Sequence, residues 1–173
     1  MLRKKLCNQL MVYDFKRDSV EQNTFLFETR LGLFYEIKFK HTPYLFENAP
    51  EYADDVYELS IILAGPGPAK TPPDPAIAYT VFAICETFIE QLGHPIFLFI
   101  CDTRDGKQAV RARTFTRWFT EINNPYLLKI DGPFPDEQVG MNYVSLIIQL
   151  SHPYFREATA AFADLMAAYN QPK

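Results

Sequence analysis

Residues 96–100 read Ile-Phe-Leu-Phe-Ile, five apolar residues in succession. A short strand without a charged residue is typical of the centre of a sheet, where other elements cover both of its faces. We therefore expect further strands beside this one and helices packed against the sheet.

The first third of the chain alternates apolar and polar residues, which is the period-2 pattern of strands with one solvated face. The 15 Phe and 10 Tyr residues also favour a substantial sheet. Gly32 provides a turn between the second and third runs. We predict an antiparallel meander in which the repeating residues are Tyr13 and Phe15, then Phe25 and Phe27, then Tyr35, Ile37 and Phe39, and after a loop Tyr57, Leu59, Ile61 and Leu63.

Two later segments have clear helical spacing. In the first, Asp74 is a suitable N-cap, Pro75 fits the first turn because its missing N–H costs nothing there, and Gly93 ends the helix. The second starts near Pro153, and its apolar face consists of Phe155, Ala158, Phe162, Leu165, Met166 and Tyr169.

Between these helices the sequence predicts one more helix and two more strands. The helix spans about residues 106–122, with Asp105 as its N-cap and Gln108 in the capping-box position. The strands cover residues 126–130 and 143–150, and the turn that joins them is expected to contain Gly132, Pro133 and Pro135.

The resulting order is β-β-β-β-α-β-α-β-β-α, which predicts an α+β fold with a largely antiparallel sheet of six or seven strands and three helices. The proline-rich segment 64–75 could be a linker between domains. The strands before it supply no helix to cover a face, however, so we predict a single domain over residues 1–173.

Composition excludes several classes of protein. The chain is 48% hydrophobic and 22% charged with a net charge of −4, as is ordinary for a soluble globular protein. No segment has the roughly 20 predominantly apolar residues of a membrane span, and no apolar stretch follows the basic residues 3–5 as in a secretory signal. The three cysteines, Cys7, Cys85 and Cys101, lack metal-ligand spacing, so we expect a cytoplasmic protein without a bound metal.

The segment Cys101–Phe119 differs from the rest of the chain in charge. Residues 104–117 hold five basic residues and one acidic residue, a local charge of +4. At about 100° per residue, Arg111 falls within the apolar face of the predicted helix. A guanidinium in apolar surroundings needs a partner, and Asp102 and Asp105 both precede the helix.

Two interpretations of this segment remain open. Arg111 and one of the two carboxylates could form a structural clamp between the end of a strand and the helix. Alternatively, Arg111, Asp102 and Gln108 could line a small polar pocket for an anionic or polar ligand, because ligands often bind at such strand ends. The candidate ligand-binding residues are therefore Asp102, Asp105, Gln108 and Arg111.

No catalytic arrangement is indicated by spacing. Four cations could form a basic face for phosphates, but the acidity of the whole chain disfavours nucleic acid. The three histidines lie close to prolines, without the spacing of metal ligands or of a catalytic base. The cations are Arg104, Lys107, Arg113 and Arg117, and the histidines are His41, His94 and His152.

The pattern Cys101-Asp102-x-x-Asp105-x-x-Gln108-x-x-Arg111-x-x-x-Phe115-x-x-Trp118-Phe119 resembles a family of Bacteroidota proteins known as a domain of unknown function. The strand that contains Val56-Tyr57-Glu58 and the Pro-Asp-Pro sequence before the first helix are similar too. The resemblance extends over nearly the whole chain. It implies a bacterial cytoplasmic protein of one domain and carries no known activity.

The order of the predicted elements is also similar to the core of the GCN5-related N-acetyltransferases. In those enzymes a glycine-rich loop opens the first of these helices, and its backbone amides hold the pyrophosphate of coenzyme A. This likeness implies coenzyme A as a cofactor. The corresponding segment here, residues 64–75, contains five prolines.

We therefore expect a non-catalytic cytoplasmic binding or interaction module without a cofactor. Its partner would be a protein or a small polar or anionic ligand, and aromatic residues on the edge of the meander could form a homodimer interface. The alternative is an enzyme with an acyltransferase-like fold, which would use coenzyme A and a polar centre near Asp102 and Arg111.

Overall fold

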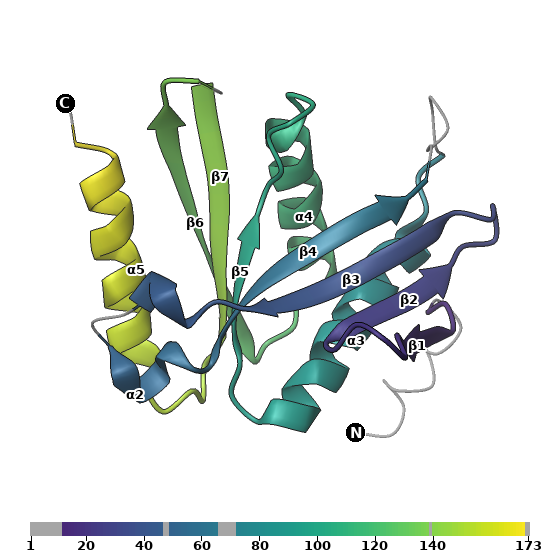
Figure 1. Ribbon diagram of the computed structural model, residues 1–173, viewed down its shortest axis with the longest axis horizontal. Helices are drawn as coiled ribbons and strands as arrows, with labels where there is room; N and C mark the ends of the chain where they lie inside the picture. The colour runs from purple at the N-terminus through teal and green to yellow at the C-terminus, as the bar shows by residue number, and fades with distance from the viewer. Residues whose placement is uncertain (1–11, 47–48, 66–71, 139, 172–173) are drawn as a thin grey trace. The chain divides into compact units, whose positions relative to one another are not determined.

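The structure is a computed structural model that describes residues 12–46, 49–65, 72–138 and 140–171 (Figure 1). Seven strands form one sheet in the order β1-β2-β3-β4-β5-β7-β6, and the pairing is mostly antiparallel. The predicted α+β class, sheet and three long helices are confirmed. The elements are β1 (Phe15–Arg17), β2 (Thr24–Glu28), β3 (Phe34–His41), the 3-10 helix η2 (Pro43–Phe46), α2 (Pro50–Ala53), β4 (Val56–Ala64), α3 (Pro75–Leu92), β5 (Ile96–Ile100), α4 (Gln108–Ile122), β6 (Leu127–Asp136), β7 (Gly140–Gln149) and α5 (Phe155–Tyr169).

The chain forms two compact units. The first takes its described residues from Met1–Lys40 and Ser60–Gly93, and the second from His41–Leu59 and His94–Lys173. Strand β4 contributes to both, because it runs from Val56 to Ala64. The expectation of a single domain stays a prediction.

In the first unit, α3 packs against the meander of β1, β2 and β3. The carboxylate of Asp74 accepts a hydrogen bond from the backbone N–H of Ala76 at 3.0 Å, and Gly93 ends the helix, both as predicted. The ring of Phe39 in β3 stacks on that of Phe88 in α3, with 4.0 Å between the ring centroids. Of the residues predicted for the covered face of β2 and β3, Tyr35 is half-buried, and the others are buried, namely Phe25, Phe27, Ile37 and Phe39.

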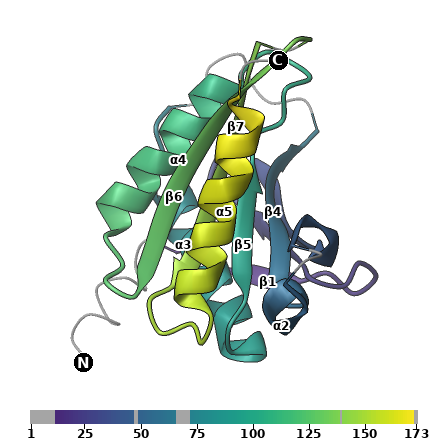
Figure 2. The same ribbon diagram turned by 90° about the vertical axis from the view of Figure 1, so that its left-hand side faces the viewer.

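In the second unit, β5 is the central strand. Residues 56–59 of β4 pair with it in parallel, and β7 pairs with it in the antiparallel direction. Leu98 belongs to the core beneath Phe162 of α5, whereas the ring of Phe99 stacks on Phe115 of α4 with 4.1 Å between centroids. Neighbouring residues of a strand point to opposite faces, so α4 and α5 cover opposite faces of this part of the sheet (Figures 1 and 2).

The hairpin of β6 and β7 is longer than predicted. Gly132, Pro133 and Pro135 do not form its turn but lie inside β6, where Pro133 pairs with Tyr143. The carbonyl of Tyr143 accepts the N–H of Cys101 at 3.0 Å, so the backbone of Tyr143 is directed to β5. Its partner Pro133 therefore directs its backbone to the outer edge of β6, as does Pro135 two residues later. An edge position needs no N–H donor, which is why a strand accommodates proline there.

Among the helices that the structure describes, none combines the length and the apolar character that crossing a bilayer requires.

Candidate functional site

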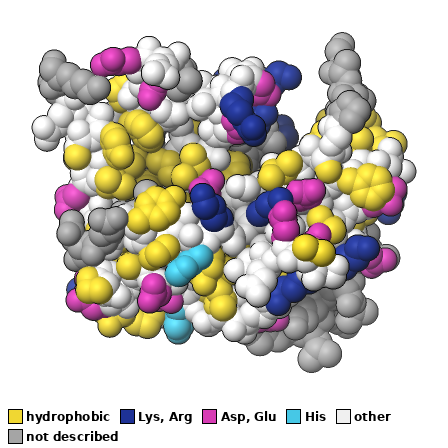
Figure 3. Space-filling model, in the orientation of Figure 1, with side chains coloured by type: hydrophobic (Ala, Val, Ile, Leu, Met, Phe, Trp, Pro, Cys, Tyr) yellow, Lys and Arg dark blue, Asp and Glu magenta, His cyan; other side chains and the backbone are white. Residues whose placement is uncertain are grey.

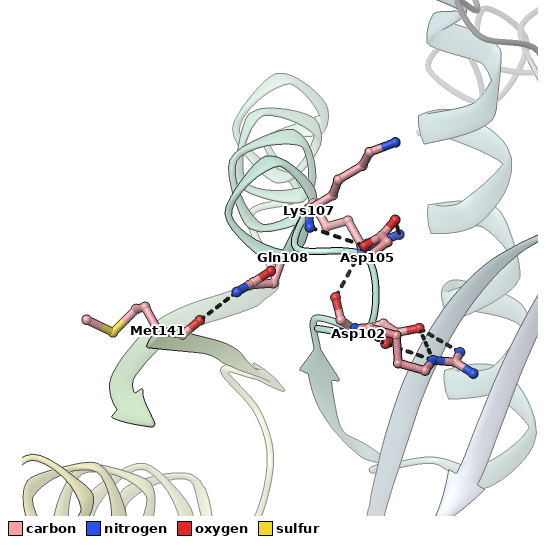
Figure 4. Close-up of polar contacts among 7 residues, drawn as sticks. Asp102, Asp105, Lys107, Gln108 and Met141 are labelled. Atoms are coloured by element: carbon pink, nitrogen blue, oxygen red, sulfur yellow. Dashed lines mark hydrogen bonds and ion pairs between the residues drawn. The ribbon is translucent and has the colours of Figure 1, made fainter. Parts of the chain in front are cut away.

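The loop between β5 and α4 places Asp102 against Arg104 (Figure 4). The Nε atom of Arg104 donates to both carboxylate oxygens, at 3.1 and 2.9 Å, and Nη2 donates to Oδ2 at 2.6 Å. The backbone N–H of Arg104 adds a fourth bond at 3.0 Å. The Asp102 carboxylate is thus engaged by its neighbour in the loop.

Arg111 of α4 pairs with Asp105. Its Nη1 and Nη2 atoms donate to the two carboxylate oxygens at 2.6 and 2.7 Å, which is the bidentate geometry that guanidinium and carboxylate favour. Nη1 also donates to the backbone carbonyl of Asp102 at 2.9 Å. The Arg111 side chain is 37% exposed, so it lies at the rim of the helix interface and is not enclosed by apolar residues. This geometry is that of a clamp between the strand end and the helix.

Asp105 does not cap α4. The helix begins at Gln108, its N-cap residue Lys107 makes no side-chain cap bond, and the Asp105 carboxylate accepts the N–H of Lys107 at 3.1 Å. The predicted helix start at Gly106 and the predicted capping box were therefore wrong. The physical reason is that Gly106 has a φ of 68°, in the left-handed region, so the backbone after Asp105 is not helical.

Gln108 lies apart from the charged pairs. Its side chain is buried, and Nε2 donates to the carbonyl of Met141 in β7 at 3.3 Å. Figure 4 shows its amide directed toward Met141 and away from Asp105. The structure thus brings Asp102, Asp105 and Arg111 together, whereas Gln108 joins the helix to the sheet.

The charges of the clamp are fixed at neutral pH. Hydrogen bonds from Arg111 hold the pKa of Asp105 well below its usual value, and hydrogen bonds from Arg104 lower the pKa of Asp102 to about 2. The bonds to Asp105 raise the pKa of Arg111. Groups with such pKa values neither accept nor release protons near pH 7, so the clamp is unsuited to general acid–base catalysis.

Basic and acidic side chains alternate over the surface of this region. Figure 3 shows both kinds side by side at the top of the view, over the loop that leads into α4. The Arg104 side chain is 89% exposed, and Lys107, Arg113 and Arg117 are exposed as well. The carboxylates neutralise Arg104 and Arg111 and leave the other three cations facing solvent.

Sequence reasoning missed a second polar cluster, where α4 faces β6 and β7. The Nζ atom of Lys129 donates to Thr116 Oγ1 at 2.9 Å and to Asp131 Oδ1, and the hydroxyl of Ser145 donates to the same carboxylate oxygen at 2.6 Å. The Lys129 side chain is only 4% exposed. One signal was present in the sequence, since Lys129 and Asp131 are two residues apart in a strand and share a face. The cluster joins α4 to both strands of the β6–β7 hairpin.

The described cysteines are buried thiols. Burial raises the pKa of Cys85 to about 12 and that of Cys101 to about 11, so neither is a reactive thiolate at neutral pH. Within the part of the chain that the structure describes, no group of three or more His, Cys, Asp or Glu side chains is arranged to hold a metal ion.

Comparison with known proteins identifies one family. No curated protein and no solved structure matches the chain. The sequence model of a family of unknown function, DUF6169, matches residues 73–164, which is more than half of the chain. The match begins just before α3, includes the clamp and the Lys129 cluster, and ends within α5. The chain therefore belongs to the DUF6169 family, a family of unknown function.

Proposed function

We propose that the protein is a non-catalytic binding module whose contact surface is the outer side of α4 with the loop before it, and that its partner is an acidic protein segment. The observation that carries this proposal is that some of the cations in the loop and helix are paired with carboxylates while others are exposed. Two cations are neutralised by bidentate carboxylates, and three others face solvent.

Helix geometry directs two of these three exposed cations away from the folded core. Arg113 and Arg117 are each two residues from the buried Phe115, so they lie about 160° around the helix from it. Among the described residues, Arg117 has one ion-pair contact, to Glu121 at 3.9 Å, and an exposed pair of this length contributes little. A positive surface of this kind in a protein of net charge −4 favours an acidic partner by charge complementarity.

The test is binding of fluorescein-labelled poly-L-glutamate, measured by anisotropy at 50 and 300 mM salt. We expect saturable binding that weakens with salt and falls about tenfold or more in the double variant Arg113→Gln/Arg117→Gln. The matched control, Lys16→Gln/Lys40→Gln, removes two exposed charges from the first unit and should bind as the wild type does.

Two outcomes would overturn the proposal. Equal loss in both double variants would mean that binding follows net charge alone. Stronger binding of a single-stranded RNA of equal charge would assign the surface to nucleic acid.

The order of elements favours a second candidate, an acyltransferase that uses coenzyme A and a polar centre near Asp102 and Arg111. A parallel β4–β5 pair, with α3 between the two strands in sequence, and the following α4 and β6–β7 hairpin agree with that likeness. The start of α3 argues against it, because the Asp74 carboxylate already accepts from Ala76 N–H and from the Tyr13 hydroxyl, the latter at 2.6 Å. A pyrophosphate at that helix end would meet a carboxylate.

Native mass spectrometry with acetyl-coenzyme A separates the two candidates. The binding-module proposal predicts the bare protein mass at every concentration. A saturable adduct that disappears in Arg111→Met would favour the acyltransferase instead. The same spectra report whether the protein is a monomer or the homodimer that the sequence suggested.

We also propose a bacterial cytoplasmic location. The two buried thiols, Cys85 and Cys101, support it, because the cytosol keeps thiols reduced. The resemblance to a Bacteroidota family supports the bacterial origin.

A further inference from the structure

His152, in the connection between β7 and α5, has a side chain with no exposed surface. Its Nδ1 atom accepts the backbone N–H of Tyr154 at 3.0 Å, and its Nε2 atom lies 3.1 Å from the backbone carbonyl of His94. A carbonyl can only accept, so Nε2 carries the proton and donates it. Both ring nitrogens of the neutral imidazole are therefore used, each in the role that its partner requires.

The imidazolium form does not fit this arrangement. Protonation would place an N–H on Nδ1, directly opposite the N–H of Tyr154, and replace a hydrogen bond with two opposed donors. The ring has no exposed surface through which water could accept the new proton. His152 can become protonated only if the Tyr154 turn moves away.

The charged groups around the ring do not remove this conflict. The Asp55 carboxylate, in the connection between α2 and β4, is 3.7 Å from Nε2, on the side of the ring where the neutral form already donates. The His94 ring, before β5, is 5.8 Å away between centroids, and its electrostatic effect lowers the pKa of His152. The first turn of α5 adds Arg156 and Glu157, whose charges are opposite.

The turn that His152 holds is the start of α5. The Tyr154 carbonyl accepts the N–H of Ala158 at 2.9 Å, and the Tyr154 ring lies 5.8 Å from that of Tyr52 in α2. Ala158 and Phe162 then pack into the core of the second unit. Displacing the turn would thus free the first turn of a helix that covers one face of the sheet.

We propose that His152 is a pH-dependent latch that keeps the first turn of α5 docked while its imidazole is neutral and releases it when the ring is protonated. This inference goes beyond the proposed function and does not depend on it. Burial lowers the pKa of His152, and the Asp55 carboxylate opposes this only in part. Because the released state binds the proton more readily, the docked state loses stability as the pH falls from about 6.5 through the lowered pKa.

Hydrogen–deuterium exchange of the full chain at pH 7.5 and 5.0, corrected for intrinsic exchange rates, tests the latch. We expect the first amides of α5 to lose protection by about tenfold for each pH unit between about 6.5 and the lowered pKa of His152, while β5 stays protected. His152→Gln should abolish this pH dependence, because its Oε1 can accept from Tyr154 and its Nε2 can donate to His94 without titrating. His41→Gln, at an exposed histidine, is the matched control and should behave as the wild type does.

A second measurement uses the wild-type protein alone, in case His152→Gln does not fold. In an NMR pH titration, the His152 Cε1–H resonance and the Phe155 amide should change with the same midpoint. The proposal is overturned if His152 titrates while the α5 amides stay unchanged, or if His152→Gln keeps the acid-induced loss of protection.

Discussion

At the scale of single residues, the clamp shows how an arginine near an apolar helix face is satisfied. Arg111 uses three hydrogen bonds, two to Asp105 and one to the backbone of Asp102, and so joins the end of β5 to α4. The pair is partly exposed, so solvent screens it and its contribution to stability is modest.

Arg111→Met should lower Tm by about 1–3 °C at pH 7, as measured by differential scanning calorimetry. Its matched control is Arg104→Met, which removes a more exposed arginine and should change Tm by about 1 °C or less. The pKa of Asp105 is lowered in the folded protein, so the stabilisation is complete above its unfolded value and is lost as the pH falls below it. The Tm difference between wild type and Arg111→Met should therefore shrink below about pH 4; a difference that stays constant down to pH 2 would contradict the clamp.

Among the ion pairs described above, loss of the Lys129 side chain should lower the free energy of unfolding most. Lys129→Met removes a buried ammonium and leaves Asp131 and Thr116 without their shared donor, so we expect a loss of about 1–3 kcal/mol in urea unfolding. Asp131 is about half exposed and can regain water, which keeps the loss below that of a fully buried pair. The double variant Lys129→Met/Asp131→Asn should lose less than the sum of the two single variants. Strict additivity would show that the ammonium and the carboxylate are not coupled.

At the scale of elements, the sequence predicts best where neighbouring residues determine the outcome. The bounds of α3 follow from Asp74, Pro75 and Gly93, which act within one turn of the helix, and β5 coincides with its apolar run. Asp105 looked like a cap by its residue type and position, but Gly106 after it has a left-handed φ of 68°, and the helix begins only at Gln108.

The length of the β6–β7 hairpin depends on tertiary structure. Prolines ordinarily predict a turn, and only an edge position in the sheet makes Pro133 and Pro135 compatible with a strand. That position follows from β7 lying between β5 and β6, which no local pattern reveals. The same limit explains why the Lys129 cluster escaped prediction, since its four side chains come from three elements.

Packing of α5 on β6 depends on the absence of a side chain at Gly132. A Cβ atom there would lie 2.9 Å from Cζ of the buried Phe162 and closer still to Met166. Gly132→Ala should therefore destabilise the protein by about 1–3 kcal/mol in urea unfolding. Adding Met166→Ala should restore part of this loss by making room for the methyl group. An alanine variant as stable as the wild type would mean that α5 shifts away from β6 at little cost.

At the scale of the whole molecule, the two compact units share one strand. Residues 56–59 of β4 belong to the second unit and pair with β5, whereas residues 60–64 belong to the first. Each unit would lose part of its sheet if the other unfolded, because half of a continuous strand cannot keep its conformation alone. We therefore expect the single domain that the sequence predicts to unfold in one cooperative step.

Urea unfolding followed by two probes tests this expectation. Trp118, the single tryptophan, reports the second unit by fluorescence, and far-ultraviolet circular dichroism reports both units. The two curves should coincide in midpoint and slope at pH 7.5. A fluorescence transition at a different urea concentration from the dichroism transition would mean that the units unfold separately and that β4 breaks between residues 59 and 60. The pH-dependent release of α5 would then be confined to the second unit, and repeating the two-probe experiment at pH 5.0 should shift the midpoint of the Trp118 curve alone.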